Sequence, residues 1–421
     1  MNEAGDHLGQ YRVRARNRQR APAAEPRLSF FWRNKWIALS LYGFPFSVGP
    51  YPTSVARFRA LARRARFAWR GQLFQTLANI AMTLGWPVGA CLTARITCSD
   101  IHRRGKAQYG MRVFFDMTWL ALRHSIPPDE YARYRFDDPE RRKDMHEYVY
   151  WNDLPGLGAL NARLGADNRD VQDKSRFAEI CASSGIPHVA TLAVFDRGKQ
   201  IHPEAAFVPD AFILWVKSLH LKGGAGGAKW IKDGEAYRNV TGRMVPAAQL
   251  AEEFRKDDCL VQPFIENHPD VARVTNGALA SLRIVTGMNT GGQAEFVTAL
   301  ISLPCGSLQT SVGGIFCSIE YDPGRIRRAA LPGGEVVANH PDTGAPIVGN
   351  VIPYWHESID LVLRAHATAF SRFAFLGWDI ALTKEKPLLL EANSGWGAIP
   401  HQMLDGPLGH TSFSQIVSHY V

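Results

Sequence analysis

The chain has 421 residues, of which 46% are hydrophobic and 21% are charged, a composition typical of a globular protein with two or three domains. It excludes a disordered chain, a collagen and a low-complexity repeat protein. The net charge of +9 is uneven, since residues 1–150 carry 25 Lys and Arg against 12 Asp and Glu, whereas residues 151–421 carry 23 against 27. We therefore expect a basic N-terminal region, residues 1–150, in front of a nearly neutral body.

The N-terminal region is predicted to be mostly helical. Residues 1–27 are rich in Arg, Ala and Pro without periodicity, so we expect a disordered arm there. Apolar side chains recur at three- and four-residue steps over 55–69, which predicts a helix capped by Thr53 or Ser54. The uncharged stretch 71–94 is interrupted by Gln, Asn, Gly and Pro, so we expect a buried or interfacial helix, broken at Pro87, and no membrane-spanning segment.

The cysteines and the charge indicate a compartment and partners. Six scattered cysteines form no CxxC pair and no zinc-type spacing, and no secretory signal is apparent, so we expect the reducing cytoplasm. The basic region fits an anionic surface, either the inner leaflet or an acidic lipid-linked glycan, or else a solvated arginine-rich helix. Nucleic acid is disfavoured because no DNA-binding motif is present.

The body, from residue 151, is predicted to be α+β. Helical patterns cover 173–187, 246–256 and 356–373, and the first is followed by a predicted strand over 188–195. Short β-rich runs separated by Gly, Pro and Asp fill most of the rest. The regular βαβ alternation of a doubly wound sheet is missing, so we expect much antiparallel strand.

A glycine cluster at 222–227 follows an apolar strand that ends in Lys217. It matches neither a P-loop nor a dinucleotide fingerprint. Glycines allow close backbone approach to phosphate, so the cluster indicates either a phosphate-covering hairpin or an ordinary flexible turn. Lys217 likewise needs an anionic partner unless it emerges at the surface.

The sharpest signal lies near the C-terminus. Strand-like runs carry Asp379 in one and Glu391 and Asn393 in the next. In a hairpin Asp379 and Glu391 could face each other, while Glu391 and Asn393 share a face because strand side chains alternate. These oxygen donors suit Mg²⁺; the alternative is a hairpin with incidental solvated acids. Arg283, inside another apolar strand, indicates either a phosphate clamp or a buried ion pair.

Taken in order, these segments resemble the ATP-grasp superfamily, and within it the sugar-transfer-associated family, over roughly residues 145–400. The strings at 339–355 and 377–397 are the most specific. The resemblance implies an ATP-grasp fold in which two α+β parts grip ATP: residues 151–265 with a glycine lid, and residues 266–421 with the metal site.

The resemblance also implies roles for single residues in binding ATP. Lys174 and Lys217 would bind phosphates, and a mobile loop over them would contain Gly223, Gly224, Gly226 and Gly227. The strand that would hold adenine contains Gln262, Phe264 and Ile265. Either Glu266 or Asp270 would reach the ribose.

The remaining roles concern catalysis. Arg283 resembles the cation near the γ-phosphate, and Lys217 shares in neutralising charge; Asp379, Glu391 and Asn393 match the Mg²⁺ ligands. Two departures are visible: Ala280 and Ser281 replace an expected Pro-Thr pair, and Trp396 is bulky for its turn.

The implied activity is that of an ATP- and Mg²⁺-dependent carboxylate–amine ligase that forms an amide through an acyl phosphate. The carboxylate would be an acidic sugar or an amino acid, free or glycan-linked, in polysaccharide biosynthesis. The alternatives are an ATP-grasp phosphotransferase and a non-catalytic nucleotide-binding module of a glycan-assembly system.

Overall fold

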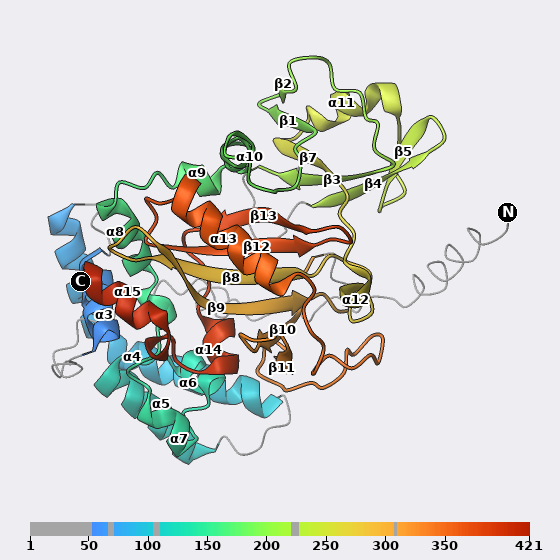
Figure 1. Cartoon of the computed structure of the whole chain (residues 1–421). Coiled ribbons are helices and arrows are strands. Elements are labelled where there is room, and N and C mark those ends of the chain that lie inside the picture. Colours follow the sequence, from blue (N-terminus) through green and yellow to red (C-terminus); the bar gives the residue numbers. More distant parts are fainter. Residues whose placement is uncertain (1–52, 66–70, 104–109, 220–226, 307–309) are drawn as a thin grey trace.

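The structure is a computed structural model that describes residues 53–65, 71–103, 110–219, 227–306 and 310–421. The predicted arm at 1–27 and the glycines Gly223, Gly224 and Gly226 lie outside the described residues. Helices and antiparallel strands both occur, which confirms the α+β prediction (Figure 1).

The smaller of two lobes is built on an antiparallel sheet with the described strand order β2-β1-β7-β3-β4-β5-β6. Helix α11 (Leu250–Phe254), extended at its start by the 3-10 turn η4 (Ala247–Gln249), packs against its apolar face. The strands are β1 (Ala193–Asp196), β2 (Lys199–His202), β3 (Ile213–Ser218), β4 (Ala228–Asp233), β5 (Ala236–Asn239), β6 (Met244–Pro246) and β7 (Cys259–Pro263).

The larger lobe contains a second antiparallel sheet, with the described order β11-β10-β9-β8-β12-β13. Helix α13 (Trp355–Ala369) covers one face, while α8 (Pro155–Arg163) and α15 (Ser412–Tyr420) cover the other, so the central strand β12 is buried along its whole length. The strands are β8 (Ser281–Met288), β9 (Ala294–Leu303), β10 (Ile315–Ile319), β11 (Ile326–Ala330), β12 (Phe375–Leu382) and β13 (Pro387–Asn393).

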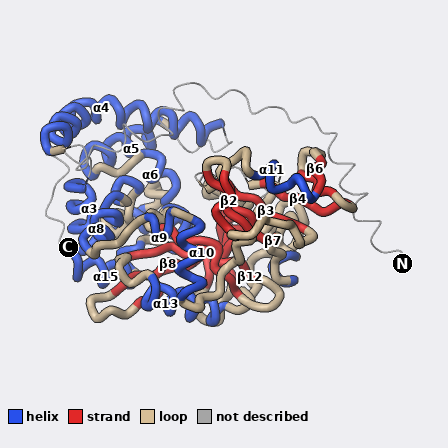
Figure 2. The backbone as a smooth tube through the Cα atoms, turned by 90° about the horizontal axis from the view of Figure 1, so that it is seen from above, coloured by secondary structure: helices blue, strands red, loops and turns tan. Residues whose placement is uncertain are grey.

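The N-terminal helices pack on the larger lobe, and α4 lies at the outer edge of the molecule (Figure 2). In chain order they are α3 (Ser54–Ala65), α4 (Gln72–Arg103), α5 (Met111–His124), α6 (Pro128–Tyr134) and α7 (Pro139–Lys143). The other short elements are η3 (Trp151–Asp153), α9 (Arg169–Gln172), α10 (Lys174–Ser183), α12 (Pro269–Ala272), α14 (Ile399–Asp405) and η5 (Leu408–His410).

Helix α3 is anchored in the body by a ring and an ion pair. The Phe58 ring meets Phe413 edge-on at 5.4 Å and lies so close to Gly156 that a Cβ there would come within 2.7 Å of it. Arg59 donates to the Asp153 carboxylate at 3.2 Å, with both side chains buried. The larger lobe therefore includes part of the predicted N-terminal region, although the predicted boundaries after residues 150 and 265 stay predictions.

Several element predictions are confirmed and one is wrong. Helix α10 lies within its predicted range and α13 begins one residue before its predicted range, whereas of the strand predicted at 188–195 only the end belongs to β1. The predicted break at Pro87 is wrong, because α4 continues through it; Trp86 is buried and donates to Ala121 O at 3.1 Å, which holds the helix on α5. None of the described helices combines the length and apolar character needed to cross a membrane.

Candidate active site between the two lobes

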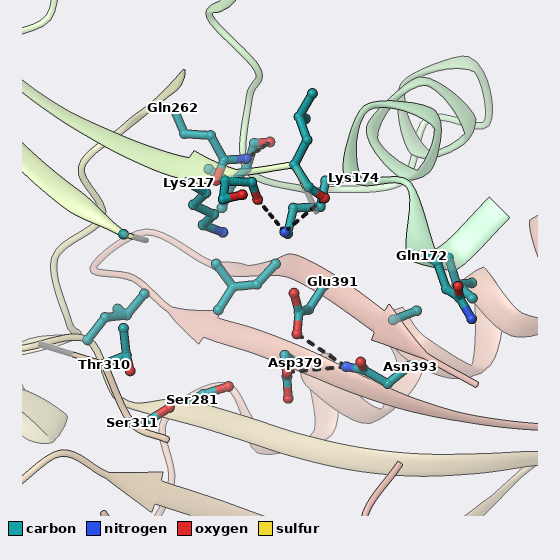
Figure 3. A pocket seen from close by; sticks show the side chains of 18 of the residues that line it. Gln172, Lys174, Lys217, Gln262, Ser281, Thr310, Ser311, Asp379, Glu391 and Asn393 are labelled. Carbon is teal, nitrogen blue, oxygen red and sulfur yellow. Dashed lines mark hydrogen bonds between the residues drawn. The ribbon is translucent and has the colours of Figure 1, made fainter. Parts of the chain in front are cut away.

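A cavity of about 500 Å³ lies between the two sheets. The smaller lobe contributes strands β3 and β7, and the larger lobe contributes the β12–β13 hairpin and the start of α10 (Figure 3). The lobes also meet directly, because Val189, in the segment before β1, donates its N–H to Leu389 O on β13 at 3.0 Å.

The β12–β13 hairpin positions two carboxylates and an amide together. Asp379 pairs with Glu391 in the strand register, which confirms that they face each other. Asn393, two residues along the same face, donates to Glu391 Oε1 at 3.3 Å and to Asp379 Oδ2 at 3.4 Å. Figure 3 shows the three side chains converging on the cavity.

The electrostatics of this group favour a bound cation. Burial, and then the proximity of Asp379, raise the pKa of Glu391, whereas Lys217 opposes that rise. Two carboxylates held together in a largely buried site are costly unless positive charge lies beside them; Arg283 and Lys217 supply part of that charge, and a bound cation would supply more. No three His, Cys, Asp or Glu side chains form a metal cluster in the described part of the chain. A cation here would therefore need Asn393, phosphate oxygens or water besides the two acids, which is the ligand set that Mg²⁺ prefers.

Arg283 forms an ion pair with Asp379 in this structure. The two residues are register partners on the neighbouring strands β8 and β12. Arg283 Nε donates to Asp379 Oδ1 at 2.7 Å and Nη2 to Oδ2 at 2.5 Å, a two-pronged pair in a largely buried position. Arg283 does not line the cavity, whereas Asp379 does. The ion pair is thus present, and the contact between Arg283 and a γ-phosphate stays a prediction.

Two lysines reach the same cavity from different elements. Lys217 lies on β3, where burial lowers its pKa and the nearby Glu391 partly restores it. Lys174 opens α10, whose N-terminus is capped by the Asp173 carboxylate, and its Nζ donates to Ser218 O at 2.6 Å. Both predicted phosphate ligands therefore lie opposite the β12–β13 hairpin (Figure 3).

The predicted adenine strand lines another wall of the cavity. Gln262, Phe264 and Ile265 all border it, and the regular strand β7 ends at Pro263. Trp215, register partner of Gln262 on β3, packs near Phe264 with ring centroids 6.4 Å apart. These apolar surfaces next to a strand end suit a flat heterocycle. Gly227, the one predicted lid glycine in the described part, also borders the cavity.

The predicted ribose contacts are not supported by their positions. Glu266 and Asp270 are exposed, and neither borders the cavity. Asp270 lies in the first turn of α12, where its carboxylate accepts from Arg273 Nη2 at 2.5 Å. Its side chain is 54% exposed.

Sequence reasoning missed several polar residues of the cavity, because they follow no spacing rule. Ser281, noted in the sequence only as a departure from an expected Thr, also lines the cavity, and its buried Oγ has no hydrogen-bond partner in the described structure. Trp396, flagged as bulky, is a core residue: it packs over Gly377, where a Cβ would lie 2.5 Å from the Trp396 Cβ. The missed lining residues include Trp215, Asn168, Gln172, Thr310, Ser311 and Ser394.

Two lobes that close on one cavity, with lysines on one side and a carboxylate hairpin on the other, define the ATP-grasp class. The chain belongs to the sugar-transfer associated ATP-grasp family, whose model matches residues 160–413. No curated protein sequence matches the chain.

Solved ATP-grasp enzymes show distant likeness. N5-carboxyaminoimidazole synthetase from Staphylococcus aureus is 9% identical, with 64% of this chain and 65% of that one covered and a TM-score of 0.35. D-alanine–D-alanine ligase from Bacillus anthracis, solved with ATP, is 13% identical, with 57% of this chain and 63% of that one covered and a TM-score of 0.29. L-amino acid ligase from Bacillus licheniformis is 12% identical, with 62% of this chain and 54% of that one covered and a TM-score of 0.31. The chain spans less than two thirds of each of these proteins.

Proposed function

We propose that this protein is an ATP- and Mg²⁺-dependent carboxylate–amine ligase that works through an acyl phosphate. The observation that carries the proposal is the arrangement of Lys174 and Lys217 opposite Asp379 and Glu391 across one cavity. Cations on one side and metal-ligating oxygens on the other suit a bound triphosphate, since phosphoryl transfer depends on positioning and charge neutralisation.

In the first step a substrate carboxylate oxygen attacks the γ-phosphorus and the bond to the β,γ-bridging oxygen breaks, which releases ADP. In the second step an amine attacks the acyl carbon, phosphate leaves with the bonding electron pair, and the amine loses a proton. Lys174 and Lys217 would neutralise the phosphate oxygens. Bound Mg²⁺ would add charge neutralisation at Asp379, Glu391 and Asn393, and Arg283 positions Asp379 for this task.

The end of the cavity near α9 suits the acceptor substrates. Neutral amides from Asn168 and Gln172 border it, together with the apolar Leu154 and Pro155 that precede and open α8. Amides pair with hydroxyls as well as with carboxylates, so this wall fits an acidic sugar or an amino acid, free or glycan-linked. The family's association with sugar transfer supports a role in polysaccharide biosynthesis.

We also propose a cellular setting. The excess of basic residues over 1–150 supports contact with an anionic surface, so the protein would act in the cytoplasm at the inner face of the membrane. The carboxylate and amine are the functional partners, and nucleic acid is not among them.

Hydroxylamine trapping tests the reaction class. The full chain is incubated with ATP, Mg²⁺ and a panel of uronic acids and amino acids, and ADP and hydroxamate are measured. A hydroxamate with ADP supports the ligase. A stable phosphorylated product would instead establish a phosphotransferase, and nucleotide binding without ADP release from any acid would indicate a non-catalytic module.

A further inference from the structure

Helix α4 presents an apolar row to solvent. Its side chains recur at three- and four-residue steps, so they share one face of the helix. Their exposed fractions lie between 52% and 76%, which is high for large apolar side chains. We call this row the outer stripe; it consists of Leu73, Leu77, Ile80, Leu84 and Val88.

The opposite face of α4 is already used by the protein. Trp86, Ala90 and Ala94 are buried, and the Trp86 indole is hydrogen-bonded to α5. This packing holds the outer stripe away from the protein core. Helix α5 adds exposed apolar side chains at four-residue steps, Met111 and Phe115, each more than 60% exposed. Figure 2 shows α4 at the edge of the described part of the molecule.

The charge pattern decides what this surface meets. From residue 26 to residue 99 the sequence contains ten Lys and Arg and no Asp or Glu, and of the ten Arg59 is buried against Asp153 and does not take part in a surface contact. Exposed Arg95 continues the helix row beyond the outer stripe, and exposed Arg112 stands beside Met111. A second copy would bring a like charge against this region, and nucleic acid would leave the leucines without an apolar partner. An anionic lipid surface satisfies both the charge and the apolar stripe.

We propose that the outer stripe inserts among the headgroups and upper acyl chains of an anionic bilayer, with α4 lying parallel to the membrane plane. This refines the surface contact proposed above, and it does not require ligase activity. Membrane insertion of α4 would also bring the cavity near the bilayer. Helix α3, directly before α4, packs on α8, and Pro155 and Gly158 of α8 border the cavity. A lipid-linked acceptor held at the membrane could thus be presented near the cavity.

Vesicle binding by the full chain tests the insertion. Sedimentation is measured with phosphatidylcholine vesicles, with and without phosphatidylglycerol, at low and high salt. We expect binding that requires the anionic lipid and falls about tenfold or more when Leu77→Glu or Leu84→Glu is introduced, because each change removes the burial of a leucine. Val208→Glu, at a site 78% exposed in the smaller lobe, is the matched control and should leave binding unchanged.

A second measurement reports how deeply α4 inserts into the bilayer. Of the six cysteines Cys91 is the exposed one, and it lies on the same face as the outer stripe. An environment-sensitive fluorophore on Cys91 should shift to the blue with anionic vesicles. Equal vesicle binding by the Leu→Glu variants and the wild type, with no shift at Cys91, would overturn the insertion and leave only an electrostatic contact. A lipid-free dimer that Leu84→Glu dissociates would overturn it in favour of self-association.

Discussion

Glu391 is a partly buried carboxylate that faces the buried carboxylate of Asp379 and the partly buried Lys217. For the proposed ligase, Glu391→Gln removes one negative metal ligand and should reduce acid-dependent ADP release by about 10²–10³. ADP release measured at saturating ATP and Mg²⁺ checks this. Glu179→Gln, at an exposed position of α10, is the control and should keep full activity. Wild-type activity in a folded Glu391→Gln protein would remove Glu391 from the site.

The same substitution carries a stability prediction. Burial raises the pKa of Glu391 above its ordinary value of 4.5, so ionisation of this group opposes folding. Its unfavourable contribution is absent below the unfolded-state pKa, grows as the pH rises from that value to the raised folded-state pKa, and is fully present above it. Without nucleotide and metal, Glu391→Gln should therefore be more stable than the wild type at neutral pH, and the difference should vanish near pH 4. Thermal melts at both pH values measure it.

The pKa of Lys217 is shifted in the opposite direction to that of Glu391. Burial lowers the pKa of this lysine, and a bound phosphate would restore the proton. ATP affinity should therefore weaken as the pH rises from neutral into the alkaline range, at lower pH than for an ordinary lysine. Lys217→Met should lower ATP affinity at neutral pH and remove this dependence, whereas Lys199→Met, exposed on β2, should change neither. Calorimetric titration with ATP across the pH range decides between these outcomes.

The pairing of strands β8 and β12 joins the metal hairpin to the rest of the larger sheet. Arg283 and Asp379 are the charged partners across that pairing, and both are largely buried. Because breaking a buried pair leaves one charge unbalanced, Arg283→Met should lower the free energy of unfolding by about 3–5 kcal/mol. Arg327→Met breaks a pair with Asp405 in which the arginine is 53% exposed, and should cost no more than about 1 kcal/mol. Chemical denaturation of both variants measures how much free energy of unfolding each change removes. Equal losses would contradict the greater burial of the Arg283–Asp379 pair.

The whole molecule joins the basic N-terminal helices to the ATP-grasp body. Phe58 is fully buried between α8 and α15, so Phe58→Ala should destabilise the protein by about 3–5 kcal/mol. Phe115→Ala, at a ring 61% exposed on α5, should cost far less. If residues 1–150 formed an independent domain, Phe58→Ala would melt that part alone and leave a second transition at the wild-type temperature. Calorimetry should instead show the larger lobe melting at a lower temperature.

The sequence alone determined the local parts of this protein. It predicted the α10 and α13 helices and the hairpin that brings Asp379 opposite Glu391, because side-chain alternation and turn residues act over short distances. The family resemblance added Lys174, whereas Lys217 was already indicated by its position at the end of an apolar strand before the glycines.

Only the tertiary structure decided which distant residues meet. It placed Trp215 in the cavity wall, paired Arg283 with Asp379, left Asp270 outside the cavity lining, and made Trp396 a core residue over Gly377. It also separated the buried Trp86 from the exposed Leu84 on one helix whose sequence is apolar on both faces. The physical reason is that burial depends on packing between segments far apart in the chain, which the local periodicity of a single element does not specify.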